Sequence, residues 1–244
     1  MAAFTYDLHV HSCLSPCADN DNTPNNLAGM GYLNGLQIMA LTDHNSCRNC
    51  PAFMQAAARY GLVPVPGMEL TTAEDIHLVC LFPSLESALA FNDEIDRQRI
   101  LIPNRKDIFG DQFILDENDT LIREEEYFLS NATNVTVDEA PALAARFQGV
   151  CYPAHIDRQA NGIVAVLGVF PDTPYFPAAE IHDLRSEFQL KQEFPILSGK
   201  HIVVSSDAHY LQDLREENAS IVLDVPEDAS PEEIRKKLIE TLSA

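Results

Sequence analysis

The sequence has few basic residues: 16 lysines and arginines stand against 37 aspartates and glutamates, giving a formal net charge of −21. Proteins that bind nucleic acid usually carry a basic patch or stripe, and no such stripe is found in this sequence. We therefore do not expect nucleic acid as a partner. An anionic substrate would instead need a local positive centre, such as metal ions.

Long apolar runs are also absent. No run approaches the roughly 20 residues that a membrane-spanning helix needs. The segment Met1–Asp7 lacks the basic region followed by an apolar one that is typical of a signal peptide. We expect a cytoplasmic protein without a membrane partner. Because 46% of the 244 residues are apolar, we also expect a single domain over residues 1–244, built on one core.

The six cysteines fit such a location, where they are expected to be reduced thiols rather than disulfides. Cys47 and Cys50 have CxxC spacing, and a structural zinc site that also uses Cys13 and Cys17 is an alternative. Its spacing is not a standard one. Ordinary thiols are therefore the favoured interpretation.

Apolar, β-branched runs alternate along the chain with helical patterns. Strands are expected at 4–10, 36–41, 62–65, 76–82, 150–152, 178–182, 201–205 and 220–225. Helices are expected at 24–33, 51–60, 84–99, 137–147, 162–169, 184–192 and 231–242. Residues 101–134 interrupt this pattern and predict an exposed insertion with turns and a short helix. The alternation predicts an α/β fold, a closed (β/α) barrel rather than an open sheet.

Two pairs of side chains have a spacing that suits a metal site. His9 and His11 are two residues apart at the end of a strand, so both point to the same face. Asp207 and His209 repeat this geometry. Other candidate ligands also follow strands, whose carboxyl ends gather at one rim of a barrel. His77 is the exception, because it lies early in its strand; either the boundary is wrong or this strand runs the other way.

Four segments carry a resemblance to a known family. Asp-Leu-His-Val-His-Ser at 7–12, Leu-Thr-Asp-His at 41–44, Gly-Met-Glu at 67–69 and Ser-Ser-Asp-Ala-His at 205–209 resemble the four motifs of the PHP (polymerase and histidinol phosphatase) superfamily. The resemblance implies a distorted (β/α)7 barrel with two or three metal ions at the strand carboxyl ends. It also implies hydrolysis of phosphoesters.

The resemblance further implies a set of metal ligands. The first metal would be held by His9, His11, Glu69 and Asp207. Glu69 would bridge to a second metal, completed by His77 and His155, and a third metal would be held by His44 and His209. The remaining ligand of the third metal departs from the family pattern. Cys17 is the favoured substitute, since thiolate binds zinc well, and Asp19 is the alternative.

Imidazole and carboxylate ligands suit zinc, manganese or iron and do not separate these metals. Two divalent ions can hold both the attacking and the leaving oxygen of a phosphoester. We expect a hydroxide that bridges two metals to attack phosphorus. Asp43 is expected to orient a ligand or to handle protons, and Arg158 to grip a phosphate oxygen. Arg48 and His182 are weaker candidates for the same pocket.

The predicted function is that of a metal-dependent phosphoesterase acting on a small phosphomonoester or nucleotide, so the expected partner is a small phosphorylated substrate. Three alternatives stay open: a 3′–5′ exonuclease or oligonucleotide phosphodiesterase, an enzyme resembling histidinol phosphatase, and a metal-binding regulatory module without catalysis. The sequence leaves open the organic part of the substrate, the native metal, the oligomeric state and the role of residues 101–134.

Overall fold

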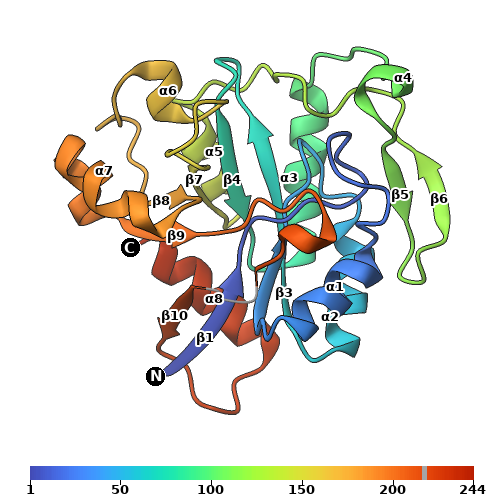
Figure 1. Cartoon of the computed structure of the whole chain (residues 1–244), viewed down its shortest axis with the longest axis horizontal. Coiled ribbons are helices and arrows are strands. Elements are labelled where there is room, and N and C mark those ends of the chain that lie inside the picture. Colours follow the sequence, from blue (N-terminus) through green and yellow to red (C-terminus); the bar gives the residue numbers. More distant parts are fainter. Residues whose placement is uncertain (216–218) are drawn as a thin grey trace.

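The computed structural model describes residues 1–215 and 219–244, and its main feature is a curled sheet (Figure 1). Six strands form this sheet in the order β10–β1–β2–β3–β4–β7. They are β1 (Ala2–Asp7), β2 (Ile38–Leu41), β3 (Val63–Thr71), β4 (His77–Leu81), β7 (Val150–Pro153) and β10 (Ser220–Leu223). All six lie at or within a few residues of the strands expected from the sequence.

The strand directions explain the exceptional position of His77. β1, β2 and β3 are parallel, whereas β4 is antiparallel to both of its neighbours, β3 and β7. His77 at the start of β4 is paired with Thr71 at the end of β3. The start of β4 therefore lies at the rim where β3 and β7 end. The second of the two alternatives for His77, a strand running the other way, is confirmed.

A separate parallel pair, β8 (Ala178–Ile181) and β9 (His201–Val204), continues the curl. The N–H of Ile156, after β7, donates to the backbone oxygen of Glu180 in β8 at 2.8 Å. An isolated parallel bridge between Val10 and Ala208 links the segments after β9 and β1. The predicted α/β class is confirmed, but a count of seven strand–helix units is not. β4 and β10 break the parallel order, and the second pair does not share the ladder of the main sheet.

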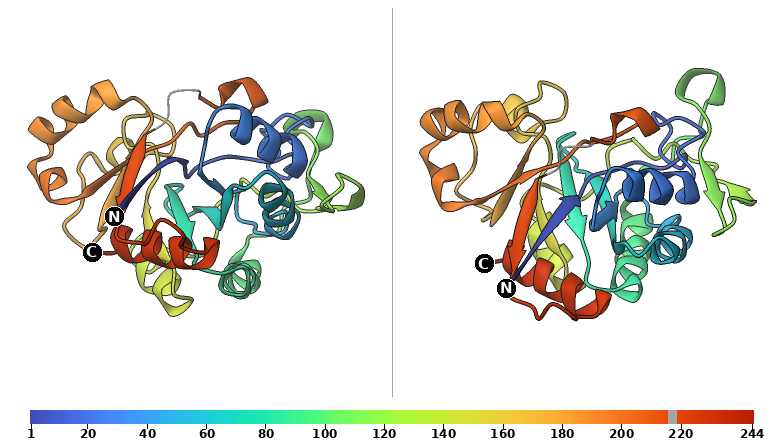
Figure 2. Two further views of the ribbon diagram at one scale, coloured as in Figure 1. Left: turned by 90° about the horizontal axis from the view of Figure 1, so that it is seen from below. Right: turned by 60° about the horizontal axis from the view of Figure 1, so that its bottom comes forward.

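Both faces of the sheet are covered, because alternate residues of each strand point to opposite sides. Met39 and Leu41 join the core beneath the helices on one face, and Ile38 and Ala40 join the core on the other. The first face packs against α1 (Pro24–Leu33), α2 (Cys50–Arg59), α3 (Leu85–Gln98) and α5 (Ala140–Arg146). The other face packs against α8 (Pro231–Leu242), as Figure 2 also shows.

The helix starts follow from local sequence. Thr23 and Ser84 cap α1 and α3 with their side-chain oxygens, and Ser230 and Glu233 form a complete capping box before α8. The chain also has shorter helical pieces, namely α6 (Ile163–Leu167), α7 (Glu187–Glu193), η1 (Leu184–Ser186), η2 (Pro195–Gly199) and η3 (Leu211–Asp213). Within the described ranges, no helix has both the length and the apolar character needed to cross a bilayer. The expected cytoplasmic location stays a prediction.

The insertion contains more regular structure than expected. It holds the short helix α4 (Lys106–Phe109), which the sequence predicted, and a hairpin of β5 (Phe113–Leu115) and β6 (Leu121–Glu124), which it did not. The N–H of Phe113 donates to the backbone oxygen of Cys13 at 2.9 Å, and Leu14 packs against Ile114 and Leu129. The insertion thus lies against the loop that follows β1, on one side of the sheet's rim (Figure 1).

Candidate metal centre

Glu69, near the end of β3, is the centre of the cluster of predicted ligands. The carboxylate is buried, and its oxygens lie within 3.4 Å of five imidazoles. The distances are 3.4 Å to His9, 3.2 Å to His11, 2.9 Å to His44, 2.9 Å to His77 and 3.2 Å to His155. These histidines come from four separate segments of the chain. The rim of the sheet therefore gathers them as the sequence predicts.

The two pairs with two-residue spacing meet next to Glu69. His9 and His11 point to one face, and their Nε2 atoms are 3.1 Å apart. Asp207 Oδ1 lies 3.1 Å from Nε2 of His11 and 3.4 Å from that of His9. The ring of His209 stacks on that of His11 at a centroid distance of 4.3 Å. The bridge between Val10 and Ala208 holds the two pairs side by side.

Three groups of these side chains are compact enough to hold a metal ion. In each group the potential ligand atoms lie within 4.8 Å of one another. The groups are His9, His11, Glu69 and Asp207; then His44, Glu69 and His77; then His11, His44 and His209. Glu69 belongs to two groups, as the family resemblance implies for a bridging ligand.

The chemistry of this cluster fits divalent cations. Glu69 Oε2, His44 Nδ1 and His155 Nδ1 are buried and have no hydrogen-bond partner among the described residues. Glu69 Oε2 and His44 Nδ1 lie only 2.9 Å apart, without the geometry of a hydrogen bond. Buried polar atoms are rarely left without partners, because their desolvation is costly. A cation bound by Glu69 and His44, which share a compact group with His77, would satisfy the first two of these atoms.

The charges of the cluster are strongly coupled. Burial would lower the pKa of His9 and His11, but the surrounding carboxylates outweigh it and raise the pKa of His11 to about 9. Burial lowers the pKa of His44 to about 3 and that of His209 to about 4. Burial also works against the charge of Glu69, yet the nearby imidazoles hold the pKa of this carboxyl well below its usual range. The carboxylate charge is therefore present to attract a cation.

Cys17 lies near this cluster but not within it. Of the described residues, neither Cys17 nor Asp19 belongs to a compact ligand group. Although part of Cys17 is exposed, packing around the sulfur and the nearby Glu69 carboxylate raise the pKa of its thiol to about 12. The Asp19 carboxylate instead accepts from the N–H of Asp21 at 2.8 Å. The choice between these two as a ligand stays a prediction. All six cysteines are free, as expected.

The carboxylate of Asp43 faces serines rather than the open pocket. It accepts from the N–H and hydroxyl of Ser12, both at 2.7 Å, and from the hydroxyl of Ser15 at 2.8 Å. Ser15 Oγ in turn lies 2.9 Å from Nδ1 of His11. The geometry therefore links Asp43 to the orientation of the His11 ring.

Arg158 lines the pocket at the cluster, and its expected contact with a phosphate oxygen stays a prediction. Its guanidinium donates to Asp207 Oδ2 and, at 2.9 Å, to Nδ1 of His182. Arg215, which the sequence did not single out, donates to the backbone oxygen of the same histidine at 2.7 Å. Burial first, and then the two arginines, lower the pKa of His182. Arg48 is turned away from the cluster and pairs with acidic side chains of α3 and the insertion, Asp96 and Glu125.

Glu180 on β8 is a partner of the cluster that sequence reasoning missed. It is buried, and His9 Nδ1 donates to its Oε1 over 2.8 Å. The same oxygen accepts from the N–H of His155 at 3.1 Å. A carboxylate behind a metal-binding histidine fixes the tautomer and aims the other nitrogen at the metal. The signal was available: Glu180 is the one charged residue in an otherwise apolar strand.

We expect Glu180→Gln to weaken metal binding by about 10- to 100-fold, because losing the charge behind His9 lowers the basicity of its imidazole. Calorimetric titration of the metal-free protein with zinc measures this affinity. Glu187→Gln on exposed α7 is the matched control and should bind zinc as the wild type does. Unchanged affinity in Glu180→Gln would show that this carboxylate is only structural.

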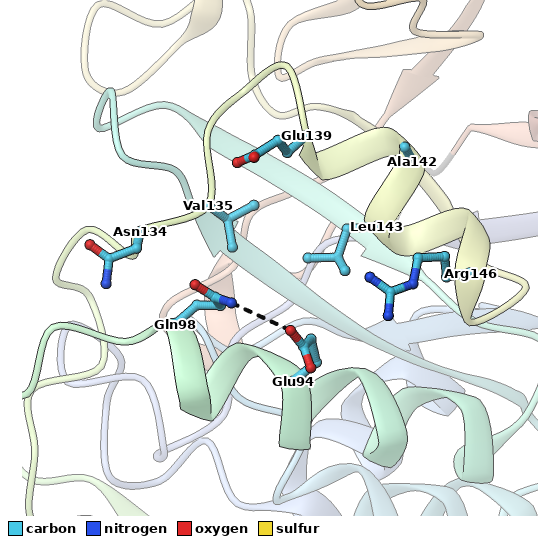
Figure 3. A pocket seen from close by; sticks show the side chains of 8 residues that line it. All are labelled: Glu94, Gln98, Asn134, Val135, Glu139, Ala142, Leu143 and Arg146. Atoms are coloured by element: carbon cyan, nitrogen blue, oxygen red, sulfur yellow. Dashed lines mark hydrogen bonds between the residues drawn. The ribbon is translucent and has the colours of Figure 1, made fainter.

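Two hollows adjoin at the cluster. One, of about 130 Å³, is lined by His44, Glu69, His77, His155, Arg158, Ala160, Asn161, Asp207 and His209. The second, of about 450 Å³, shares His44, His77 and Asn161 with the first and extends toward the insertion. A third pocket, of about 380 Å³, lies between α3 and α5, where Glu94 accepts a hydrogen bond from Gln98 (Figure 3). None of the predicted ligands lines this third pocket.

A comparison with protein families identifies the fold. The model of the PHP domain matches residues 7–135, which is more than half of the 244 residues. The chain belongs to the PHP domain family. The matched segment carries three of the four motifs. The last motif, at 205–209, lies beyond this segment, and the fold places it beside the first motif.

Known relatives of this PHP domain are larger proteins or distant ones. An error-prone DNA polymerase from Symbiobacterium thermophilum is 36% identical over 74 residues, which are 30% of this chain and 7% of the polymerase. The lesion-specific endonuclease Q from Pyrococcus furiosus superposes with a TM-score of 0.60 at 16% identity, over 99% of this chain and 56% of the endonuclease. The chain thus spans about half the length of that nuclease.

A third relative is closer in size. A protein from Bifidobacterium adolescentis, provisionally described as a metal-dependent phosphoesterase, has a TM-score of 0.56 at 16% identity. The match covers 84% of this chain and 87% of that protein. These two solved relatives are thus named as an endonuclease and a phosphoesterase, both hydrolases of phosphoester bonds. At these identities the superpositions establish the shared fold.

The expectation that nucleic acid is not a partner is wrong. Endonuclease Q was solved with a 27-mer DNA duplex whose abasic lesion is at the active site, and that structure covers 96% of this chain with a TM-score of 0.62. The net charge of −21 describes the whole surface, whereas phosphate is recognised locally. A cluster that binds cations can supply positive charge that the sequence does not count.

Proposed function

We propose that this PHP domain hydrolyses phosphoester bonds with divalent metal ions held at the rim of its sheet. The observation that carries the proposal is the convergence of seven predicted ligands around an eighth, Glu69, from segments that begin at residue 9 and end at residue 209. One domain over residues 1–244 remains part of this proposal.

The donor set suggests how two or three ions would be distributed. His9, His11, Glu69 and Asp207 would hold the first ion, and Glu69, His77 and His155 the second. His44 and His209, with Cys17 or Asp19, would hold a third. Imidazole and carboxylate suit zinc, manganese or iron. Bound ions would lower the pKa of a coordinated water from about 15.7 to near 7 and so supply a hydroxide that attacks phosphorus.

The remaining groups of the protein have separate tasks. The hollow of about 130 Å³ at the cluster receives the phosphoryl group, with the organic part left outside it. Arg158, whose side chain is 38% exposed, lies where it can donate to a phosphate oxygen. Asp43, through Ser15, holds His11 in one orientation. A catalytic contact of Asp43 with the substrate is not part of the proposal.

Two substrate classes are candidates. The first is a phosphomonoester or nucleotide, supported by the small size of the hollow at the cluster. The second is a phosphodiester in nucleic acid, supported by the fold shared with endonuclease Q in its DNA complex. Incubating the protein with manganese and a panel of phosphomonoesters, nucleotides, single-stranded oligonucleotides and duplexes with an abasic site separates the two. Failure to hydrolyse any member of this panel with manganese, zinc or iron would contradict the proposal.

Arg158→Gln is expected to lower kcat/KM by about 10- to 100-fold, because hydrogen bonds to charged groups are worth roughly 1.5–3 kcal/mol. Steady-state kinetics on the best substrate of the panel measures this. Arg185→Gln is the matched control, since Arg185 is 91% exposed and pairs only with Asp183 among the described residues. An equal change in both variants would remove Arg158 from the substrate site.

A further inference from the structure

The larger hollow beside the metal cluster has an unusual wall. It is lined by Pro16, Cys17, His44, His77, Ile108, Phe109, Phe128, Ser130 and Asn161. Three of these residues also line the cluster pocket, so the two hollows are neighbours. A substrate with its phosphate at the cluster can therefore extend its organic part into the larger hollow.

The far wall is apolar and aromatic. Ile108 is 57% exposed and Phe109 is 39% exposed, both on α4. The ring of Phe128 stacks on that of Phe109 at a centroid distance of 4.2 Å and an interplanar angle of 29°. Exposed apolar groups gathered at the edge of a polar site often mark a binding surface. The stacked rings offer a flat face rather than a narrow slot.

Local contacts hold this wall in place. Gly110, directly after α4, has a positive φ of 95°, and a Cβ there would collide with the backbone oxygen of Pro16. Asn104 donates from Nδ2 to the backbone oxygen of Gly110 at 2.9 Å. The insertion therefore fits closely against the loop of Cys17, and the wall is formed before any ligand binds.

A polar group accompanies the wall. The buried hydroxyl oxygen of Ser130 lines the same hollow and has no hydrogen-bond partner of normal geometry among the described residues. Because this oxygen is covered, only a turn of the Ser130 side chain would bring it to the polar edge of a ligand. A flat apolar face with a hydrogen-bonding group beside it suits a planar heterocycle better than an alkyl chain or a sugar.

We propose that Ile108, Phe109 and Phe128 form a stacking platform for a nucleobase of the substrate, whose phosphate lies at the metal cluster. This inference rests on the proposed function and narrows the substrate to a nucleotide unit. The unit can belong to a mononucleotide or to an oligonucleotide. Stacking on one aromatic side chain typically strengthens binding by about 5- to 100-fold.

The absence of tryptophan from the chain makes a direct binding test possible. Phe109→Trp places a single tryptophan in the platform, and Phe188→Trp places one on α7, where the side chain is 73% exposed and away from the insertion. Metal-loaded samples are titrated with AMP, with ribose 5-phosphate and with a short single-stranded oligonucleotide while tryptophan fluorescence is recorded.

We expect saturable quenching of Phe109→Trp by AMP or by the oligonucleotide, no quenching by ribose 5-phosphate, and none in Phe188→Trp. Quenching by AMP identifies a mononucleotide site, and quenching by the oligonucleotide alone identifies a nucleic-acid site. Equal quenching of both variants, or quenching by ribose 5-phosphate as strong as by AMP, would overturn the inference. Absence of any quenching would do so as well.

Kinetics separate the platform from the proposed function. Phe109→Ala is expected to raise KM for the nucleobase-containing substrate by about 5- to 100-fold and to leave hydrolysis of ribose 5-phosphate unchanged. Phe109→Leu should be intermediate. An equal effect on both substrates contradicts the platform but leaves the phosphoesterase proposal intact. If the wild type hydrolyses no member of the substrate panel, the proposed function fails, and the quenching experiment still decides the platform.

Discussion

Replacement of Glu69 by glutamine should nearly abolish both metal binding and hydrolysis. Among the residues that the structure describes, Glu69 is the one carboxylate that approaches five imidazoles, and it belongs to two of the three compact ligand groups. The amide keeps the shape but loses the charge. Metal ions supply several kcal/mol of transition-state stabilisation, and each ~1.4 kcal/mol is tenfold in rate, so kcat should fall by at least about 1,000-fold.

Metal content by mass spectrometry and kcat on the best substrate measure this effect. Glu86→Gln is the matched control, because Glu86 is exposed in the first turn of α3, which follows the end of β4 opposite His77. Full metal content in Glu69→Gln, with activity retained, would refute the assignment of Glu69 as the central ligand.

Removal of the metal ions should both stop hydrolysis and lower thermal stability. The metal-free cluster leaves buried imidazoles and carboxylates close together, with several atoms lacking hydrogen-bond partners among the described residues. A ligand present at 100 times its Kd stabilises the folded state by about 2.7 kcal/mol. For a chain of this size, that corresponds to a fall in Tm of about 5–10 °C on chelation.

Calorimetric scans with and without a chelator measure the shift, and addition of excess zinc or manganese should restore both Tm and activity. Glu69→Gln provides an internal control, because a variant that binds no metal should not respond to the chelator. If the wild-type Tm were unaffected by exhaustive chelation, the cluster would not be a metal centre.

Much of the fold could be predicted because local signals and tertiary structure agree. Helices α1, α3 and α8 begin within one residue of the expected positions, where Thr23, Ser84 and Ser230 cap them. Each ligand pair follows a strand, so its two side chains point to the same rim of the sheet. The pair of His9 and His11 therefore meets the pair of Asp207 and His209. The caps and the apolar periodicity are local signals, and the bridge between Val10 and Ala208 then brings the two pairs together.

The hairpin of the insertion was not predictable on the same grounds. All four residues of β6 are exposed, so no alternation of apolar and polar residues marks the strand. Its turn is held by Asp116, whose Oδ1 accepts from the N–H groups of Asn118 and Thr120, both at 2.8 Å. In the sequence, this acidic stretch reads simply as a loop.

The reversed direction of β4 had only indirect support in the sequence. Residues Ile76–Phe82 predict a buried strand but contain nothing that sets its direction. Only the position of His77, early in the strand, indicated that an antiparallel strand would bring it to the rim. The role of Glu180 was hidden for a related reason, because its partner His9 is 171 residues away.

The contacts between the insertion and the loop after β1 limit how this protein can be altered. Asn20 donates to Asp111 at 3.1 Å and Thr23 donates to Asp119 at 2.6 Å, in addition to the close fit of Gly110 against Pro16. Grafting a foreign 101–134 segment onto this framework would therefore also disturb the neighbourhood of Cys17. Attempts to re-engineer substrate preference should therefore exchange residues 11–23 and 101–134 together, as one structural unit.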